Sequence, residues 1–262
     1  MKYLAIVLLG LITFASCQKS IDIDLNDANP VVVIEANYTA EDSTVRVRVT
    51  ETSNFFSGED SPTIDDAVVT ITNEAGVSTV VPFVSNGRYL TDNYAPEFGT
   101  TYTMTVLANG VTYTATCDML PIIDQFPIIY DYIEPGPFSG DGGYAVAVSY
   151  QDPAVEGDFT SAHITRNDTV YNELNDVVLN DDQFTNGNLV IRPLFVDLFD
   201  IGDSVEIELR TINEKVHDYY VELSSLTDPN SAAPANPTYQ WENRALGFFS
   251  AYPSSRQSVI IQ

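Results

Sequence analysis

The chain has 262 residues and a formal net charge of −26, and 44% of its residues are hydrophobic. This apolar content is too high for a disordered chain, and the strong negative charge argues against binding to nucleic acid or adsorption on anionic lipid. The length suffices for two small domains or one large β domain.

The first residues are predicted to be a secretory signal. Lys2 supplies a positive charge, and the apolar run that ends at Phe14 is about eleven residues long, whereas a membrane-spanning helix needs roughly twenty. Phe14-Ala15-Ser16-Cys17 matches the lipobox of bacterial lipoproteins, although Phe14 replaces the usual Leu or Val. We therefore predict a signal peptide over residues 1–16, acylation of Cys17 and a polar tether over residues 17–30. The alternative is a plain secretory signal followed by a chance cysteine.

Residues 31–120 show the two-residue period of half-buried strands. Val45, Val47 and Val49 alternate with arginines, and the same alternation recurs before and after Asn109-Gly110. Both residues of this dipeptide tolerate positive φ, so it predicts a two-residue hairpin turn. Several short antiparallel strands at this spacing predict a β-sandwich of immunoglobulin or prealbumin type over residues 31–120.

Residues 121–262 are predicted to form a second β-rich domain. Its first part, Pro121 to Pro137, is rich in proline and apolar residues and is interpreted as a linker or crossing segment. Alternation then resumes in Tyr144–Tyr150 and in Val205–Leu209, which are predicted to be strands.

One segment of this second half has the pattern of a helix. Apolar residues recur at helical spacing from Val216 to Leu226, with acidic residues on the opposite face. One amphipathic helix is therefore predicted at about 213–227. A last strand is predicted over 258–261.

No catalytic motif is found. The sequence contains no Gly-x-Ser-x-Gly elbow, no His-Glu-x-x-His helix, no phosphate-binding loop and no dinucleotide fingerprint. Cys117 shares the apolar face of its strand and is predicted to be a core residue. His163 and His217 have no cysteine or second histidine at ligand spacing, so both are interpreted as exposed structural residues. These observations predict a protein that is not an enzyme and uses no cofactor.

Acidic loops are the remaining place for a metal ion. Calcium takes six to eight oxygen ligands, and the best candidate loop contains Asn180, Asp181 and Asp182. None of the acidic clusters has the spacing of an EF-hand. A carboxylate pair would also suit a glycosidase, but in so acidic a chain the spacing of carboxylates is uninformative. No metal site is therefore predicted, and the 180–182 loop is kept as the calcium candidate.

Two aromatic groups are candidate contact residues for a partner. Phe55 and Phe56 lie in the loop after the Val45 strand, and Tyr239 and Trp241 lie in a loop near the C-terminal end. Exposed aromatic residues mark binding surfaces and can stack on sugar rings. The alternative is that both groups fold back and close the ends of their sandwiches.

Several stretches spread over the chain carry a family resemblance. They are Cys17 of the lipobox, Val32 to Ala36, Ala67 to Thr72, Gly87-Arg88-Tyr89 with Gly99 to Tyr102, and Asn243 to Ala251. The last stretch, which contains Ala-Leu-Gly-Phe-Phe-Ser after a Tyr-Tyr helix, is the most specific. With these stretches the chain resembles a Bacteroidota-type outer-membrane lipoprotein family of unknown function (DUF4249-like) that is encoded beside TonB-dependent receptors.

The resemblance implies a binding function and supplies no catalytic residues. It implies an accessory lipoprotein, lipid-anchored at the outer membrane, that binds a TonB-dependent receptor, a nutrient ligand or both. Acidic residues soon after the cysteine direct some such lipoproteins to the cell surface, and here apolar residues of the tether dilute them. We expect the cell surface as the location. The alternative function is a structural or adhesive surface lipoprotein with no transport role.

Three short triplets resemble the Asp-Ser/Thr-apolar site of O-glycosylation in exported Bacteroidota-type proteins. They are centred on Ser43, Thr169 and Ser204. An acidic chain also contains such triplets by chance, so unmodified loop residues are the alternative.

Overall fold

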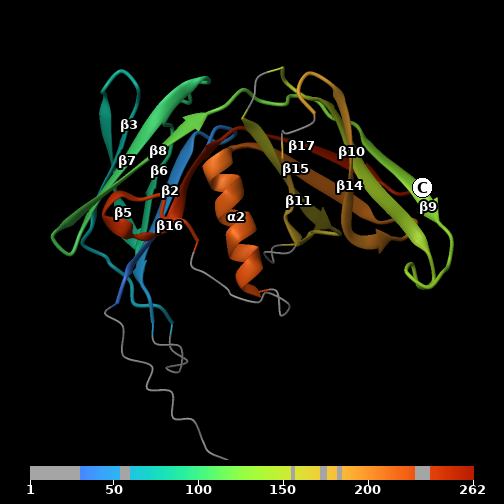
Figure 1. Ribbon diagram of the computed structural model, residues 1–262, viewed down its shortest axis with the longest axis horizontal. Helices are drawn as coiled ribbons and strands as arrows, with labels where there is room; N and C mark the ends of the chain where they lie inside the picture. Colours follow the sequence, from blue (N-terminus) through green and yellow to red (C-terminus); the bar gives the residue numbers. More distant parts are fainter. Residues whose placement is uncertain (1–29, 54–59, 155–156, 172–175, 182–184, 228–236) are drawn as a thin grey trace, which may run out of the picture.

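The structure is a computed structural model, and it describes residues 30–262 apart from 54–59, 155–156, 172–175, 182–184 and 228–236. The protein is mainly β, as predicted: its strands form two β-sandwiches, and one long helix, α2 (Glu214–Thr227), lies between them (Figure 1). Within the described chain, no helix has the length and apolar character needed to cross a membrane.

The first sandwich consists of two sheets that share one core. One sheet has the strand order β16-β1-β2-β6-β5 and the other the order β4-β3-β7-β8. The strands are β1 (Val32–Thr39), β2 (Thr44–Glu51), β3 (Val68–Thr72), β4 (Ser78–Val81), β5 (Phe83–Ser85), β6 (Arg88–Thr91), β7 (Thr100–Ala108), β8 (Val111–Met119) and β16 (Leu246–Tyr252).

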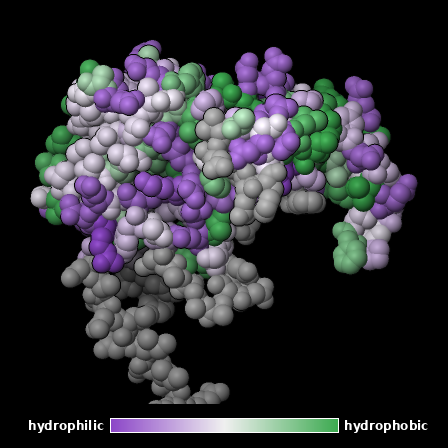
Figure 2. Space-filling view, turned by 45° about the horizontal axis from the view of Figure 1, so that its top comes forward, coloured by the Kyte–Doolittle hydropathy of each residue, from purple (hydrophilic) through white to green (hydrophobic). Residues whose placement is uncertain are grey.

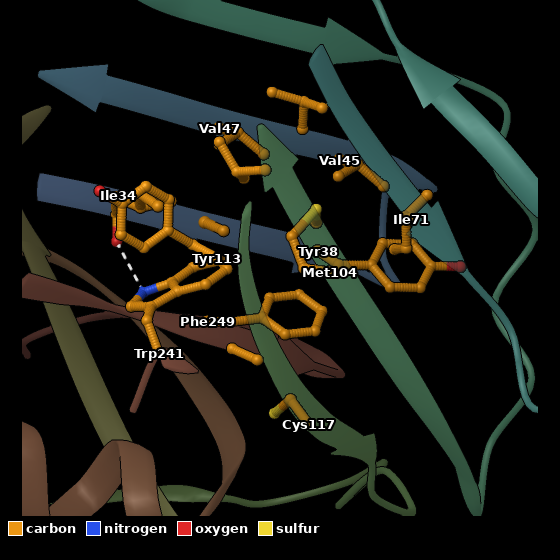
Figure 3. Packing of buried hydrophobic residues seen from close by; sticks show 14 of the residues in the cluster. Ile34, Tyr38, Val45, Val47, Ile71, Met104, Tyr113, Cys117, Trp241 and Phe249 are labelled. Atoms are coloured by element: carbon orange, nitrogen blue, oxygen red, sulfur yellow. Dashed lines mark hydrogen bonds between the residues drawn. The ribbon is translucent and has the colours of Figure 1, made fainter. Parts of the chain in front are cut away.

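The alternation in these strands builds the core in the predicted way. Val45, Val47 and Val49 are at most 3% exposed and belong to one apolar cluster with residues of the other sheet (Figure 3). Asn109 and Gly110 join β7 to β8, and both have positive φ, 51° and 76°. The predicted hairpin and the predicted sandwich are therefore confirmed.

The edge strand β16 comes from the far end of the chain and pairs in parallel with β1. Its register places Phe249 opposite Ala36, and Phe249 is buried in the first core (Figure 3). The boundary predicted after residue 120 is therefore wrong for the 241–252 segment, which completes the first sandwich. Alternation within a segment indicates a strand, but it does not reveal a pairing partner so distant in the chain.

The second sandwich packs the sheet β14-β10-β9 against the sheet β12-β11-β15-β17, and β13 pairs with β11 beside the latter. The predicted inward faces of β10 and β15 line its core. The strands are β9 (Ile128–Ile133), β10 (Gly143–Gln151), β11 (Asp158–Arg166), β12 (Thr169–Val170), β13 (Val178–Asn180), β14 (Leu189–Phe199), β15 (Ser204–Asn213) and β17 (Ser254–Ile260).

Strand β9 lies within the segment Pro121–Pro137, so the interpretation of this whole segment as a linker is wrong. β9 pairs with β10 from Ile128 opposite Val148 to Ile133 opposite Gly143. It forms an edge of its sheet, and most of its side chains are exposed or half-buried. Only Ile128 and Tyr130 pack against the core, and apolar residues also occupy the exposed face, so the sequence of β9 does not alternate strongly.

Helix α2 confirms the helix predicted at 213–227, and it contacts both sandwiches. The ring of Tyr219 lies 5.3 Å from that of Phe248 on β16. The ring of His217 lies 4.7 Å from that of Phe159 on β11. The helix therefore packs on the outer face of a sheet from each sandwich and fixes their relative position.

Candidate functional site

The candidate aromatic pair Tyr239 and Trp241 is divided between surface and core. Trp241 is 2% exposed, and its indole Nε1 donates a hydrogen bond to the carbonyl oxygen of Ile34 (3.2 Å; Figure 3). The interpretation of Trp241 as a contact for a partner is therefore wrong, because its loop leads directly into buried β16. Tyr239 remains at the surface, 36% exposed, with the guanidinium carbon of Arg244 4.8 Å from its ring centre.

Some predicted site residues lie outside the described residues. These are the acylation site Cys17, the aromatic pair Phe55 and Phe56, and Asp182. The three candidate glycosylation residues are described: Thr169 and Ser204 are exposed, and Ser43 is half-buried in the turn between β1 and β2. Modification at these three positions remains a prediction.

The calcium interpretation of the 180–182 loop is not supported by the position of Asn180. This residue ends strand β13, is 7% exposed, and donates through its side-chain nitrogen to Thr160 Oγ1 (3.1 Å) inside the sandwich. Asp181 is exposed. Among the described residues, no group of three or more His, Cys, Asp or Glu side chains is placed to hold a metal ion.

Cys117 is a core residue, as predicted. It is 5% exposed, and burial raises the pKa of its thiol to about 12. Its sulfur accepts a hydrogen bond from the backbone N–H of Ala251 (3.2 Å) on β16, and its thiol donates to the side-chain oxygen of Asn213. A thiol with this pKa and these partners is unreactive at neutral pH.

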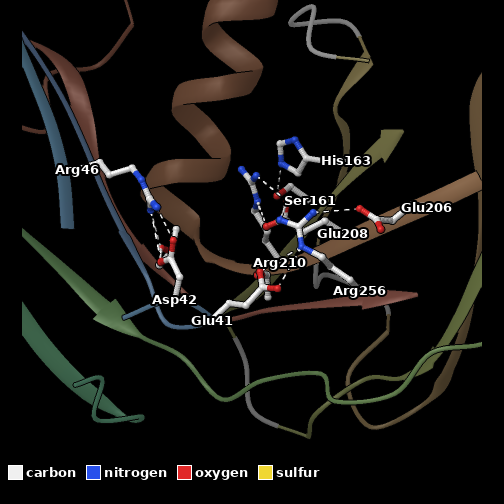
Figure 4. A network of polar contacts seen from close by, with 11 residues as sticks. Glu41, Asp42, Arg46, Ser161, His163, Glu206, Glu208, Arg210 and Arg256 are labelled. Carbon is white, nitrogen blue, oxygen red and sulfur yellow. Dashed lines mark hydrogen bonds and ion pairs between the residues drawn. The ribbon is translucent and has the colours of Figure 1, made fainter. Parts of the chain in front are cut away.

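A network of charged side chains connects the two sandwiches (Figure 4). Glu208 on β15 is 7% exposed and accepts two hydrogen bonds from Arg210, both 2.9 Å long. It also forms an ion pair with Arg256 on β17, with the nitrogen and oxygen 3.0 Å apart. Arg256 also pairs with Glu206 and with Glu41 of the β1–β2 turn, each at 3.2 Å. Burial alone would raise the pKa of Glu208, but the two arginines outweigh it and hold the pKa below its usual value. Each of the three carboxylates thus pairs with at least one of the two arginines.

His163 lies beside this network on β11. It is half-buried, and burial together with the charge of Arg210 lowers its pKa to about 3. His217 has only 13% of its side chain exposed, so the prediction that both histidines are exposed is wrong. His163, Arg210 and Arg256 line a hollow of about 460 Å³. A histidine with this pKa stays neutral and cannot exchange a proton near pH 7, so the arrangement suits a structural role.

The most exposed large apolar residue in the described part of the chain, Phe138, lies on the hairpin of β9 and β10. Phe138, in the turn between these strands, is fully exposed, and Ile129, Tyr132 and Ile133 of β9 are at least 40% exposed. The turn is held by an isolated bridge between Gly136 and Gly140. Figure 2 shows apolar side chains at this projecting end of the molecule. We name the surface made of Ile129, Ile133 and Phe138 the hairpin surface. Tyr132 lies on the opposite face of β9, where its ring packs 5.3 Å from that of Tyr144.

Sequence reasoning missed the hairpin surface because its Pro- and Gly-rich context suggested a linker. A large aromatic residue between Pro137 and Ser139, within a turn sequence, is the signal that indicates it. Such a residue gains nothing from the fold, since it has no core to enter, and large exposed apolar groups mark interaction sites.

The comparisons with known proteins identify the family. The sequence profile of the family described as "Domain of unknown function (DUF4249)" matches residues 18–258. The chain belongs to the DUF4249 family. The match spans both sandwiches of this DUF4249 protein, including β16 and the greater part of β17. A search of curated proteins found no match.

Several solved structures resemble this DUF4249 protein at low identity. A two-domain fibronectin type III segment from chicken tenascin is 12% identical, with 89% of this chain and 99% of that chain covered and a TM-score of 0.26. The chicken interferon gamma receptor alpha chain is 9% identical, with 89% of this chain and 99% of that chain covered and a TM-score of 0.26. A chain of a cytokine receptor complex is 10% identical, with 86% of this chain and 94% of that chain covered and a TM-score of 0.26. At these scores no argument about function is drawn from them.

Proposed function

We propose that this protein is a lipid-anchored accessory protein of the outer membrane that binds a TonB-dependent receptor and has no catalytic turnover. The lipobox at Cys17 supports the anchor, and the family resemblance supports the identity of the partner. The observation that carries the binding role is the hairpin surface, where Phe138 is fully exposed.

The hairpin surface has the composition of a protein-binding site. It combines an exposed aromatic residue, Phe138, with two exposed isoleucines, and aromatic anchors supply much of the binding energy at interfaces. Its backbone is a strand pair continuous with the second sandwich, so little conformational entropy would be lost when a partner binds. Loops on such a rigid scaffold are where recognition commonly occurs.

The orientation of the hairpin supports a partner in the same membrane as the anchor. In Figure 1 the described chain begins below the first sandwich, at the start of β1, and the β9–β10 turn hangs below the second sandwich. The start of β1 and the β9–β10 turn therefore lie on the same side of the described molecule. Confinement by a lipid raises the local concentration of a membrane partner at that side.

The receptor contact can be tested by affinity capture of the full-length protein after mild detergent extraction. Wild-type protein should recover a TonB-dependent receptor, identified by mass spectrometry, and Phe138→Ala should reduce this recovery at least about tenfold. Phe98→Ala is the matched control, because Phe98 is 50% exposed and belongs to the first sandwich. No receptor with wild-type protein would overturn the proposed partner. Equal recovery with Phe138→Ala would overturn the proposed surface.

The anchor is tested separately at Cys17. Cys17→Ser should abolish labelling by a fatty-acid probe and release the protein from membranes, because acyl chains contribute roughly 0.8 kcal/mol per buried methylene. Membrane attachment and normal processing of Cys17→Ser would contradict the anchor.

A further inference from the structure

Three arginines gather on the outer face of the five-stranded sheet of the first sandwich. Arg46 and Arg48 lie on β2 and Arg88 lies on β6, and all three are exposed. The chain has only 11 Lys and Arg residues against 37 Asp and Glu. The register places Arg48 directly opposite Arg88. Like charges directly opposite each other on a sheet are destabilising, so this pair lowers the stability of the empty protein.

Arg48 and Arg88 have no partner among the described residues. Arg46 is engaged, because it forms an ion pair with Asp42 and a hydrogen bond with Thr39 (Figure 4). For Arg48 and Arg88, by contrast, the described part of the chain supplies neither a side-chain hydrogen bond nor an ion pair. Guanidinium groups that the described residues leave without a partner can bind an anion, and guanidinium binds carboxylate or phosphate with two parallel hydrogen bonds.

These arginines line an open groove of about 550 Å³, within the size range of small-molecule sites. Glu35 is the one carboxylate among the lining residues, and it stands opposite Arg48 on β1. Three guanidinium groups therefore face the groove against one carboxylate. The groove is thus a positive region of a strongly acidic chain.

The groove also has an apolar side. Val84 and Leu90 are 58% and 38% exposed, and both line it. Phe248 lines it at the edge of the sheet, where the ring of Tyr220 of helix α2 packs 5.5 Å from the Phe248 ring. An occupant can thus contact a guanidinium pair and exposed apolar carbon at the same time.

We propose that this groove binds a small amphiphilic organic anion. Arg48 and Arg88 hold its carboxylate or phosphate group, and its apolar part lies along Val84, Leu90 and Phe248. A ligand of this kind relieves the repulsion between the two guanidinium groups and covers the exposed apolar residues. A polyanion such as nucleic acid is disfavoured, because the net charge of −26 repels it over distances longer than the groove. This site is independent of the proposed receptor contact.

Binding can be measured on the full-length protein in dodecyl maltoside through the fluorescence of Trp241, which is the only tryptophan and is buried. Octyl phosphate and octanoate are the probes, and a bound ligand raises the unfolding temperature in a saturable way. Octyl glucoside is the neutral control with the same chain, and inorganic phosphate is the control without a chain. We expect at least one of the two anions to bind at least about tenfold more tightly than either control.

The arginines are tested by Arg48→Ala and Arg88→Ala, each of which should weaken binding of that anion at least about tenfold. Arg244→Ala, which removes an exposed arginine outside the groove, should leave the affinity unchanged. Arg88→Lys keeps the charge without the planar fork and should bind with intermediate affinity. Arg88→Lys also keeps the test possible if Arg88→Ala does not fold, because it retains a long charged side chain at this position.

Four results would overturn the proposal. They are the absence of a saturable shift with both anions, equal affinity for octyl glucoside, equal affinity for inorganic phosphate, and wild-type affinity in both Arg48→Ala and Arg88→Ala. A loss of affinity in Arg244→Ala equal to that in Arg48→Ala and Arg88→Ala would also count against the proposal. It would show that the affinity depends on the net charge of the protein and not on these two arginines.

Discussion

Gly247 faces Ile34 so closely that a Cβ atom on Gly247 would lie 2.1 Å from the carbonyl oxygen of Ile34. Gly247 belongs to β16 and Ile34 to β1, and the two residues are opposite each other in the parallel pair. Gly247 also has a φ of 94°, which L side chains rarely adopt. The absence of a side chain here is what allows the C-terminal strand to complete the first sandwich.

Gly247→Ala is therefore expected to destabilise the protein strongly. The reason is a clash with backbone atoms of Ile34, which cannot be relieved by a side-chain rotation. Gly202→Ala is the matched control: its φ is 91°, and nothing lies within 4 Å of the added Cβ. Denaturant unfolding should show a loss on the order of 3 kcal/mol more for Gly247→Ala than for Gly202→Ala. Equal losses would show that backbone conformation alone matters.

The same strand pair marks the limit of what the sequence could predict. Alternation at Val45, Val47 and Val49 and the turn at Asn109-Gly110 are local signals, and the structure confirms both. The pairing of β16 with β1 is not local, since the sequence of either strand does not indicate which strand it pairs with. The burial of Trp241 depends on that pairing, so an apparent surface loop became core. The register of Arg48 with Arg88 and the exposure of Phe138 depend equally on tertiary structure.

Trp241 is expected to act as a core residue. Trp241→Phe removes the indole N–H that binds Ile34 and leaves a cavity, so it should lower the free energy of unfolding by about 2–3 kcal/mol. Tyr239→Phe, at the neighbouring surface position, should change it by less than about 0.5 kcal/mol. Circular dichroism can follow unfolding of both variants, since the fluorescent residue is lost in one. A neutral effect of Trp241→Phe would contradict its burial.

Cys117 is expected to be protected from reagents and to contribute to stability. Its pKa of about 12 and its burial predict that a polar thiol reagent reacts with it in the unfolded protein and not in the native one. Cys117→Ala should cost about 1–2 kcal/mol, because it leaves a small cavity and an unpaired N–H at Ala251. Reagent labelling monitored by mass spectrometry, with and without denaturant, tests the first expectation. Rapid labelling of the native protein would be inconsistent with this structure.

The last prediction concerns pH and His163. The pKa of this residue is about 3 in the folded protein, against a usual value of 6.5, because burial and the charge of Arg210 disfavour the protonated ring. Below pH 6.5 the unfolded chain therefore binds a proton that the folded protein excludes. Stability rises with pH wherever the unfolded state holds more protons. The contribution is thus fully present above pH 6.5 and is lost progressively as the pH falls toward 3.

The window between pH 7 and pH 5.5 isolates this effect, because the carboxylates with shifted pKa values titrate below it: Glu208 has a lowered pKa and that of Asp42 is about 2. The free energy of unfolding of the wild type should fall across this window with a slope approaching about 1.4 kcal/mol per pH unit at its acid end. His163→Gln has no ring to protonate, so it should remove the slope that His163 contributes. His217→Gln is the control for the other histidine and should keep that slope. Identical slopes in the wild type and in His163→Gln would mean that the imidazole is solvated, contrary to its place beside Arg210 and Arg256.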